Sequence, residues 1–332
     1  MDPIDLTKQL CRIPSPSGDE AAVTDFMAGQ LGSLGYRVTR QAVAPNRANL
    51  YAVLDDPLVV LCTHLDVVPP HLELREDAEW LYGRGVQDAK GIAAAMVSAA
   101  VRLRDLGERR VALLFTVGEE TGSDGAKAAA ALALKGRFLI NGEPTENRLC
   151  IGQKGALHYI LTASGVAAHS AYPEEGVSAT EALLDSLARI RALALPADPL
   201  LGPSTLNIGR LQGGVATNVI PPHAMADLMF RTVAPTAELD RAVRAALSPN
   251  VSAQVGFDTP FYKAPALPGW DVTTVSYASD LPHLSAWGTG YQMGPGTIRV
   301  AHTAHERVLK QDLRDGVDCY ARLITDLIES VR

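Results

Sequence analysis

The chain has 332 residues, of which 47% are hydrophobic and 5% aromatic, and its formal net charge is −7. This length predicts one large domain with a smaller one, and the apolar content is sufficient for packed cores. An acidic chain without a basic run is not expected to bind nucleic acid or an anionic membrane.

The N-terminal segment and the cysteines indicate the compartment. Residues 1–12 lack the basic start and apolar stretch of a signal peptide. No segment approaches the roughly 20 uninterrupted apolar residues of a membrane span, so we expect a cytoplasmic protein. The four cysteines, at positions 11, 62, 150 and 319, form no CxxC pair. This favours buried reduced thiols over disulfides.

Helical patterns alternate with short apolar runs in the first 150 residues. Apolar residues at helical spacing predict helices, and short apolar runs bounded by polar or Gly/Pro residues predict buried strands. The expected helices are 2–12, 19–34, 90–106 and 123–134, and the expected strands are 49–54, 58–66, 111–117 and 137–141. Alternation of strand and helix predicts an α/β layer fold.

The pattern changes near Gly152, where strand-like segments begin to outnumber helical ones. The expected strands are 157–166, 204–211, 222–233 and 251–261, and the expected helices are 179–195 and 236–248. This set predicts a compact two-layer domain inserted into the first one. We place the catalytic domain at 1–153 and 265–332 and the inserted domain at 154–264, with a final helix over 308–331.

The first chemical motif is THLD at residues 63–66, at the end of a predicted strand. Residues two apart point to the same side of a strand, so Asp66 can lie beside His64. A carboxylate there accepts the second ring N–H of a metal-binding histidine and orients the ring. A strand-end turn with an incidental histidine is the alternative.

The second motif is GRGVQDAKG at residues 83–91, directly before a predicted helix. It is not the dinucleotide-binding GxGxxG fingerprint, because Asp88 stands where the third glycine belongs. Two interpretations of Asp88 remain open at this point. It is either the N-cap of the helix or a carboxylate that bridges two metal ions.

Acidic residues and a histidine complete the set. Glu119 and Glu120 follow the predicted strand 111–117, and Glu143 precedes a proline after the next strand. His302 follows the turn MGPG at 293–296. Sites in open α/β sheets form at the carboxyl ends of strands, where these residues are expected. Solvated acids at a helix start are the alternative for the glutamate pair.

These motifs, in this order from His64 to Glu306, resemble the dinuclear zinc aminoacylase and carboxypeptidase family. Within it they resemble the branch of acetylornithine deacetylase, acetyl-lysine deacetylase and succinyl-diaminopimelate desuccinylase. The resemblance implies a zinc-peptidase-like three-layer catalytic domain with an inserted ferredoxin-like α+β domain for dimerisation or closure. It also implies two zinc ions, for which cobalt can substitute, and a homodimer.

The resemblance assigns a role to each motif residue. The metal ligands it implies are His64, Asp88, Glu120, Glu143 and His302, with Asp88 shared by both ions. Asp66 would orient His64, and Glu119 would be the general base that passes a proton from water to the departing amine. The chain departs from the family at His305, where an Asp is common, and we assign the ligand role to His302.

The resemblance also implies substrate contacts. His169, in GVAAHSAYP at 165–173, would donate to the developing oxyanion and in dimeric members comes from the partner subunit. Arg231 would bind the substrate α-carboxylate, which suits a guanidinium fork. Further contacts are implied for Tyr172, Asn218 and Gly296. A plain turn at Asn218 and a structural salt bridge at Arg231 are the alternatives.

The predicted function is hydrolysis of an N-acyl amide of an amino acid. An N-acetyl group on ornithine, lysine or citrulline is the leading expectation for this small-molecule substrate. A di- or aminopeptidase of the same family and a desuccinylase are the alternatives. A non-catalytic binding protein on the same fold is a further one, because fold and function are separable.

Overall fold

The computed structural model describes residues 1–132 and 136–331, and the chain divides into two compact units. Unit 1 comprises residues 1–151, 263–273 and 279–332, and unit 2 comprises 152–262 and 274–278. Residues 274–278 therefore correct the expected boundary, which gave the whole of 265–332 to the first domain. The reason is a backbone pairing in which the Lys154 N–H donates to the carbonyl of Val275 at 3.2 Å.

A nine-stranded mixed sheet, most of whose residues belong to unit 1, has the order β1-β2-β6-β3-β7-β17-β8-β15 with β16 beside β8. Its strands are β1 (Arg37–Ala44), β2 (Arg47–Val53), β3 (Val59–His64), β6 (Val111–Thr116), β7 (Phe138–Asn141), β8 (Leu149–Gln153), β15 (Tyr262–Lys263), β16 (Val272–Val275) and β17 (Thr289–Gln292). The adjacent strands β6, β3, β7 and β17 run parallel. Their carboxyl ends therefore meet at one edge of the sheet, as the motif positions predict.

Several strands were not predicted, and β1 shows why. Most of its side chains are exposed or partly exposed, so no buried apolar run marks it in the sequence. It forms by antiparallel pairing with β2 across a tight turn at Asn46, whose φ is 59°. The pairing partner, rather than local hydrophobicity, makes this segment a strand.

Helices cover both faces of this sheet. Those of unit 1 are α1 (Pro3–Cys11), α2 (Ala21–Ser33), α3 (Lys90–Asp105), α4 (Asp124–Ala129) and α7 (Lys310–Glu329). Leu50 and Ala52 of β2 pack into the main core with residues of α1, α2, α3 and α7. Tyr51 points the opposite way and meets the ring of Trp287, which donates a hydrogen bond to the carbonyl of Ala129 in α4. The three-layer prediction is confirmed, although the end of the expected helix 123–134 lies outside the described residues.

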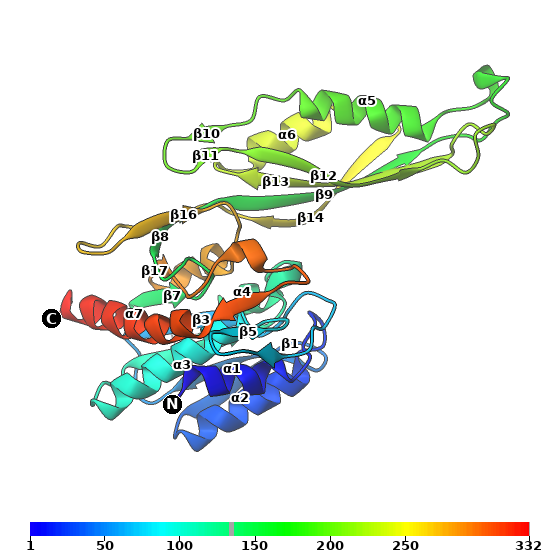
Figure 1. The fold of residues 1–332 in the computed structure, drawn as a ribbon. Helices are drawn as coiled ribbons and strands as arrows, with labels where there is room; N and C mark the ends of the chain where they lie inside the picture. The colour runs from blue at the N-terminus through cyan, green and yellow to red at the C-terminus, as the bar shows by residue number, and fades with distance from the viewer. Residues whose placement is uncertain (133–135, 332) are drawn as a thin grey trace. The chain divides into compact units, whose positions relative to one another are not determined.

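Unit 2 is a four-stranded antiparallel sheet with two helices, in the order β12-β13-β9-β14. Its elements are β9 (Gly155–Ser164), α5 (Ala179–Arg191), β12 (Thr205–Gly213), β13 (His223–Thr232), α6 (Ala237–Ala245) and β14 (Val251–Thr259). Both helices lie on the same face of the sheet (Figure 1), where Tyr159 and Phe230 form part of a separate buried core. This βαββαβ order is the ferredoxin-like arrangement that was predicted.

Smaller elements complete the chain. They are the sheet β18-β5-β4, from Arg307–Leu309, Trp80–Tyr82 and Arg75–Glu76, the pair β10 (Ala197–Asp198) and β11 (Gly202–Pro203), and the 3₁₀ turns η1 (Glu119–Thr121), η2 (Pro173–Glu175), η3 (Leu281–Trp287) and η4 (Ile298–Val300). The four cysteines are free thiols, as expected. Within 1–132 and 136–331, none of the helices combines the length and apolarity that crossing a membrane requires.

Candidate metal centre

His64 is the last residue of β3, a strand that is buried along its whole length. Its Nδ1 lies 2.9 Å from the backbone carbonyl of Asp66 and 3.5 Å from the Asp66 carboxylate, and its Nε2 lies 3.1 Å from Oδ1 of Asp88. Burial alone would lower the pKa of His64, but the hydrogen bonds to Asp66 and Asp88 raise it well above 6.5. Asp66 thus lies beside the ring as predicted, with its backbone carbonyl as the nearer partner.

The Asp66 carboxylate makes contacts that the strand periodicity did not predict. Its oxygens accept the backbone N–H groups of Glu119 and Glu120, both at 3.2 Å, and the hydroxyl of Ser17 at 2.6 Å. One buried carboxylate therefore holds His64 and the turn that carries the two glutamates. The sequence did not indicate a role for Ser17 in this site, because its partner lies 49 residues away.

Asp88 is not the N-cap of α3, so the helix-cap interpretation that the sequence left open is wrong. The N-cap position is Ala89, and no side chain caps this helix. The Asp88 carboxylate instead lies between two imidazoles, with Oδ2 at 3.3 Å from Nε2 of His302. Burial opposes its ionisation, but the hydrogen bonds from His302 and His64 outweigh burial and hold the pKa of Asp88 below its usual value.

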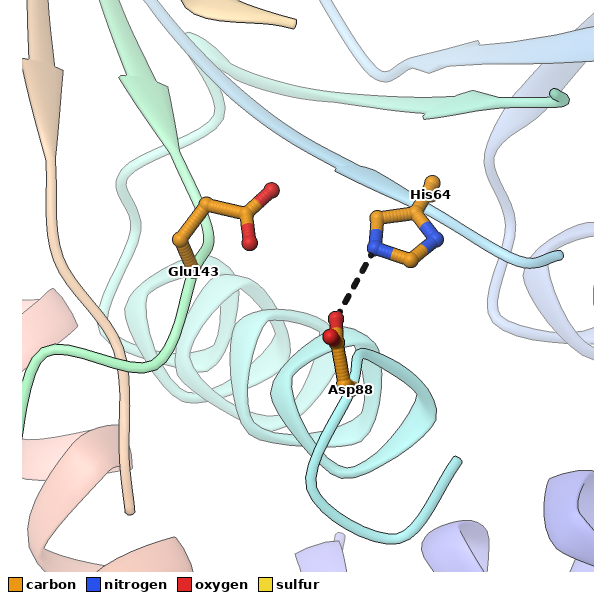
Figure 2. Close-up of side chains that lie close together, drawn as sticks. All are labelled: His64, Asp88 and Glu143. Carbon is orange, nitrogen blue, oxygen red and sulfur yellow. Dashed lines mark hydrogen bonds and ion pairs between the residues drawn. The ribbon is translucent and has the colours of Figure 1, made fainter. Parts of the chain in front are cut away.

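Potential metal ligands fall into two groups that share Asp88. The groups are His64, Asp88 and Glu143, and Asp88, Glu120 and His302, with the ligand atoms of each within 4.8 Å of one another. Figure 2 shows the first group, in which the three side chains converge on one space and a dashed line joins His64 to Asp88. Two imidazoles and three carboxylates are a donor set that suits zinc, so the residues fit a pair of divalent ions.

The carboxylates of the centre crowd one another. Burial, and then the negative charge of Asp88, raise the pKa of Glu143 well above its usual value. Burial and the charge of Glu143 do the same for Glu119, and burial and the charge of Asp88 raise the pKa of Glu120. Buried like charges are costly unless cations lie between them. This crowding is a second observation that fits a metal pair.

His302 lies in a loop after η4 and has a left-handed backbone with φ of 61°. Its Nε2 is 2.9 Å from Oε1 of Glu120, and its side chain is 50% exposed. Hydrogen bonds to Asp88 and Glu120 raise the pKa of His302 to about 10, so a metal ion that binds here must displace a proton. His305 is exposed and belongs to neither ligand group among the described residues.

Glu119 stands at the start of η1 and is also outside both ligand groups. Its backbone is held through Asp66, next to the ligand Glu120. A carboxylate that adjoins the centre without being needed as a ligand is free to exchange a proton with water. The base role of Glu119 remains a prediction that this placement permits.

Sequence reasoning missed Asp280, which is 1% exposed in unit 1. Its Oδ2 accepts the Thr116 hydroxyl at 2.7 Å, and within the described chain its Oδ1 has no hydrogen-bond partner. After the larger effect of burial, the charge of Asp280 also contributes to the raised pKa values of Glu119 and Glu143. No periodicity or spacing in the sequence connects residue 280 to the centre.

The structure brings together three of the residues predicted for unit 2. His169 pairs with Val219, and the Ser170 N–H donates to the carbonyl of Asn218 at 3.0 Å. The ring of Tyr172 lies 6.2 Å from that of His169 in an edge-on arrangement. The Ala171 N–H donates to Nδ1 of His169 at 3.1 Å. In the neutral ring the proton therefore sits on Nε2, where it can be donated to a ligand.

Within unit 2, Arg231 lies apart from that group. Arg231 is near the end of β13, opposite Ala156 of β9 and Thr205 of β12. Gly296 belongs to unit 1 and has φ of 71°. A Cβ at this position would lie 1.9 Å from the side-chain oxygen of Gln87, so close packing against the Asp88 loop accounts for this glycine. Its substrate contact remains a prediction.

Comparisons with known proteins agree with this geometry. The model of peptidase family M20/M25/M40 matches residues 60–326. An M20 peptidase domain-containing protein of Schizosaccharomyces pombe is 38% identical over 335 residues, covering 97% of this chain and 84% of that protein. A probable carboxypeptidase of Aspergillus fumigatus is 37% identical over 372 residues, covering 96% of this chain and 84% of that protein.

A solved structure matches in fold. An M20 family metallo-carboxypeptidase from Sulfolobus solfataricus superposes with a TM-score of 0.79 at 15% identity, covering 97% of this chain and 98% of that one. These comparisons show the family, whereas membership of the deacetylase and desuccinylase branch remains a prediction. The chain belongs to peptidase family M20/M25/M40 and is a hydrolase of the metallopeptidase type.

Proposed function

We propose that the protein hydrolyses the amide bond on the nitrogen of an amino acid that has a free α-carboxylate, with two zinc ions as cofactors. The observation that carries this proposal is Asp88, which two groups of potential ligand atoms share. A shared carboxylate suits two closely spaced ions, the arrangement that acts on both the water and the carbonyl. The complete ligand set also disfavours a non-catalytic binding protein.

The substrate class covers two kinds of molecule that differ only in the acyl group. An N-acetyl amino acid and the C-terminus of a peptide have the same leaving amine and the same free carboxylate. N-acetyl derivatives of ornithine, lysine or citrulline are the leading small substrates from the sequence. The Aspergillus relative is described as a probable carboxypeptidase, which favours peptides with a free C-terminus over an N-succinyl substrate or an aminopeptidase reaction.

The chain's own residues supply the proton transfers. When bound, the two ions would acidify a water molecule and polarise the scissile carbonyl. Their positive charge would also offset the crowding that raises the pKa of Glu119, leaving this carboxylate ionised. Glu119 then accepts a proton from the attacking water and gives it to the nitrogen of the departing amine. Asp66 keeps the Glu119 backbone in place during the transfer through the N–H contact at 3.2 Å.

His169 has the geometry of a donor to the carbonyl oxygen. Its Nδ1 is occupied by the Ala171 N–H, so in the neutral ring Nε2 carries the proton and can donate it to a ligand. A donor aimed at the developing negative charge stabilises the transition state more than the ground state. Asn218 lies in the turn directly before Val219, the residue that pairs with His169, and would contact the same part of the substrate.

The separation of His169 and Arg231 within unit 2 supports the proposal of a homodimer. His169 pairs with Val219, just before β13 begins, whereas Arg231 is near the end of that strand. The extended backbone from His223 to Arg231 spans roughly 26 Å at about 3.3 Å per residue. In an N-acetyl amino acid, or at the C-terminus of a peptide, the α-carboxylate and the scissile carbonyl are far closer together than this span. We propose that each substrate contacts Arg231 of one chain and His169 of a second copy.

Mixing two inactive variants tests this arrangement. Arg231→Ala and His169→Ala are each expected to lose most of the activity alone, and after mixing and subunit exchange about a quarter of wild-type activity should return. Random exchange makes half of the dimers mixed, and each mixed dimer has one site with both residues intact. The measurement is activity against mixing ratio, with sedimentation to verify the dimer. Absence of recovery in an exchanged dimer would place both residues in the same chain.

A substrate panel tests the reaction class. With zinc or cobalt present, N-acetyl amino acids and N-blocked dipeptides with a free carboxylate should be cleaved. The same dipeptides with an amidated C-terminus should lose at least about tenfold in kcat/KM, because Arg231 then has no carboxylate to bind. Mass spectrometry measures the release of the free amino acid from the N-acetyl amino acids and from the N-blocked dipeptides. Preferential cleavage of amidated peptides with a free amine would favour an aminopeptidase and contradict the proposal.

A further inference from the structure

Glu306 is a fully buried carboxylate that no role described so far uses. It lies four residues after His302, and its side chain is 0% exposed. Its Oε1 accepts the backbone N–H groups of Gly85, Gln87 and Asp88 at 2.8, 3.2 and 3.3 Å. Backbone N–H groups of one loop that converge in this way form a concave anion site, and here the anion is a side chain of the same protein.

Arg84 neutralises this carboxylate. Its Nη1 lies 2.6 Å from Oε2 of Glu306, and its Nε donates to the carbonyl of Pro70 at 3.2 Å. Both side chains are almost completely buried, at 2% and 0% exposure. A buried ion pair is a weak source of stability, because desolvation offsets much of the attraction. The hydrogen bonds of the pair have well-defined directions, so the pair fixes the position of the Glu306 carboxylate relative to Arg84.

The two segments that Glu306 joins both carry potential metal ligands. One is the loop that ends in Asp88, and the other is the stretch from His302 to Glu306. The Gly83 N–H also donates to the backbone carbonyl of Glu306 at 3.2 Å, which attaches the same segments a second time. The Glu306 contact reaches the Asp88 backbone itself, and the Asp88 carboxylate lies 3.3 Å from the His302 ring.

We propose that Glu306, together with Arg84, is a positioning residue that fixes the shared carboxylate of Asp88 relative to His302 and thereby sets the affinity for the metal pair. This inference rests on the proposed metal centre. Because Asp88 belongs to both ligand groups, displacement of its backbone weakens both sites together. A merely structural ion pair would instead change the stability of the fold and leave metal affinity unchanged.

Glu306→Gln is the most informative variant. The amide has the shape of the carboxylate and keeps one oxygen that can accept the three N–H groups, but it loses the charge that holds Arg84. Outer contacts of metal ligands typically change affinity by about 10- to 100-fold when removed. We therefore expect cobalt(II) titrations, read by visible absorption and chelator competition, to show a loss in this range at both sites. Arg84→Gln, which removes the partner charge, should shift both affinities in the same direction.

Leu327→Ala is the matched control for stability. Leu327 is 1% exposed in the core of unit 1, so the variant lowers the melting temperature by creating a cavity without contacting the centre. Its cobalt affinity should equal that of the wild type. If Glu306→Gln and Arg84→Gln both keep wild-type cobalt affinity and only melt earlier, as Leu327→Ala does, the positioning role is wrong. Failure of the wild type itself to bind cobalt would overturn the metal centre, and this inference with it.

Discussion

Replacing Glu119 with Gln is expected to lower kcat by about 10²- to 10⁴-fold while both metal ions still bind. The amide is nearly isosteric with the carboxylate but cannot accept a proton from water at neutral pH. Glu119 belongs to neither ligand group, so its loss leaves the ligand set complete. Its backbone N–H, which donates to Asp66 at 3.2 Å, is unchanged by the substitution. Steady-state kinetics and metal analysis of the same preparation measure the two effects separately.

The neighbouring residue supplies the control for this experiment. Glu120→Gln makes the same chemical change one position along the chain, but Glu120 is part of a ligand group with Asp88 and His302. This variant should lose metal at one site, and added zinc should restore part of its activity. Rescue by added metal is not expected for Glu119→Gln. If Glu119→Gln turns over at the wild-type rate, or loses metal as Glu120→Gln does, the general-base assignment is wrong.

Replacing Asp88 with Ala is expected to abolish binding of both ions, the largest effect on the cofactor of any single substitution. Asp88 contacts His64 with one oxygen and His302 with the other, at 3.1 and 3.3 Å. Its removal takes a ligand from each site at once. It also removes the negative charge that separates two imidazoles, which would repel each other when protonated. The bound metal should fall from about two ions to near zero by elemental analysis.

Variants of ligands that belong to one group distinguish a shared carboxylate from two independent sites. Glu143→Gln and His302→Ala should each retain about one tightly bound ion. Asp25→Asn is the negative control, since Asp25 lies exposed on α2 in an ion pair with Arg40 and is expected to keep both. Retention of one tightly bound ion by Asp88→Ala would show that the carboxylate serves a single site.

Much of the metal centre was predictable because its residues follow elements with strong local signals. The buried strands β3, β6 and β7 appear in the sequence as apolar runs, and their parallel order brings their carboxyl ends together. The strand pattern therefore predicts that His64, the pair Glu119 and Glu120, and Glu143 lie near one another, whereas only the family resemblance placed Asp88 with them. The same reasoning failed for β1, whose exposed side chains leave no apolar pattern.

Contacts between polar residues that are distant in sequence could not be predicted. The Ser17 hydroxyl donates to Asp66, which is 49 residues away in the sequence. Glu306 accepts the N–H of Gly85, which is 221 residues away. Nothing local distinguishes such a carboxylate from a solvated one, because its burial depends on where the chain returns. Asp280 was missed for the same reason. These contacts depend on the folded backbone rather than on side-chain periodicity.

The sequence by itself determined which residues could serve as ligands, because ligand chemistry belongs to the side chain and the strand pattern orders the motifs. Only the tertiary structure decided how their atoms lie in space. It placed Asp88 between two ligand groups rather than at a helix cap, and it connected Asp66 to the turn that carries Glu119. It also separated His169 from Arg231 by most of the length of β13. The physical reason is that bridging and separation are distances in space, which a spacing along the chain does not specify.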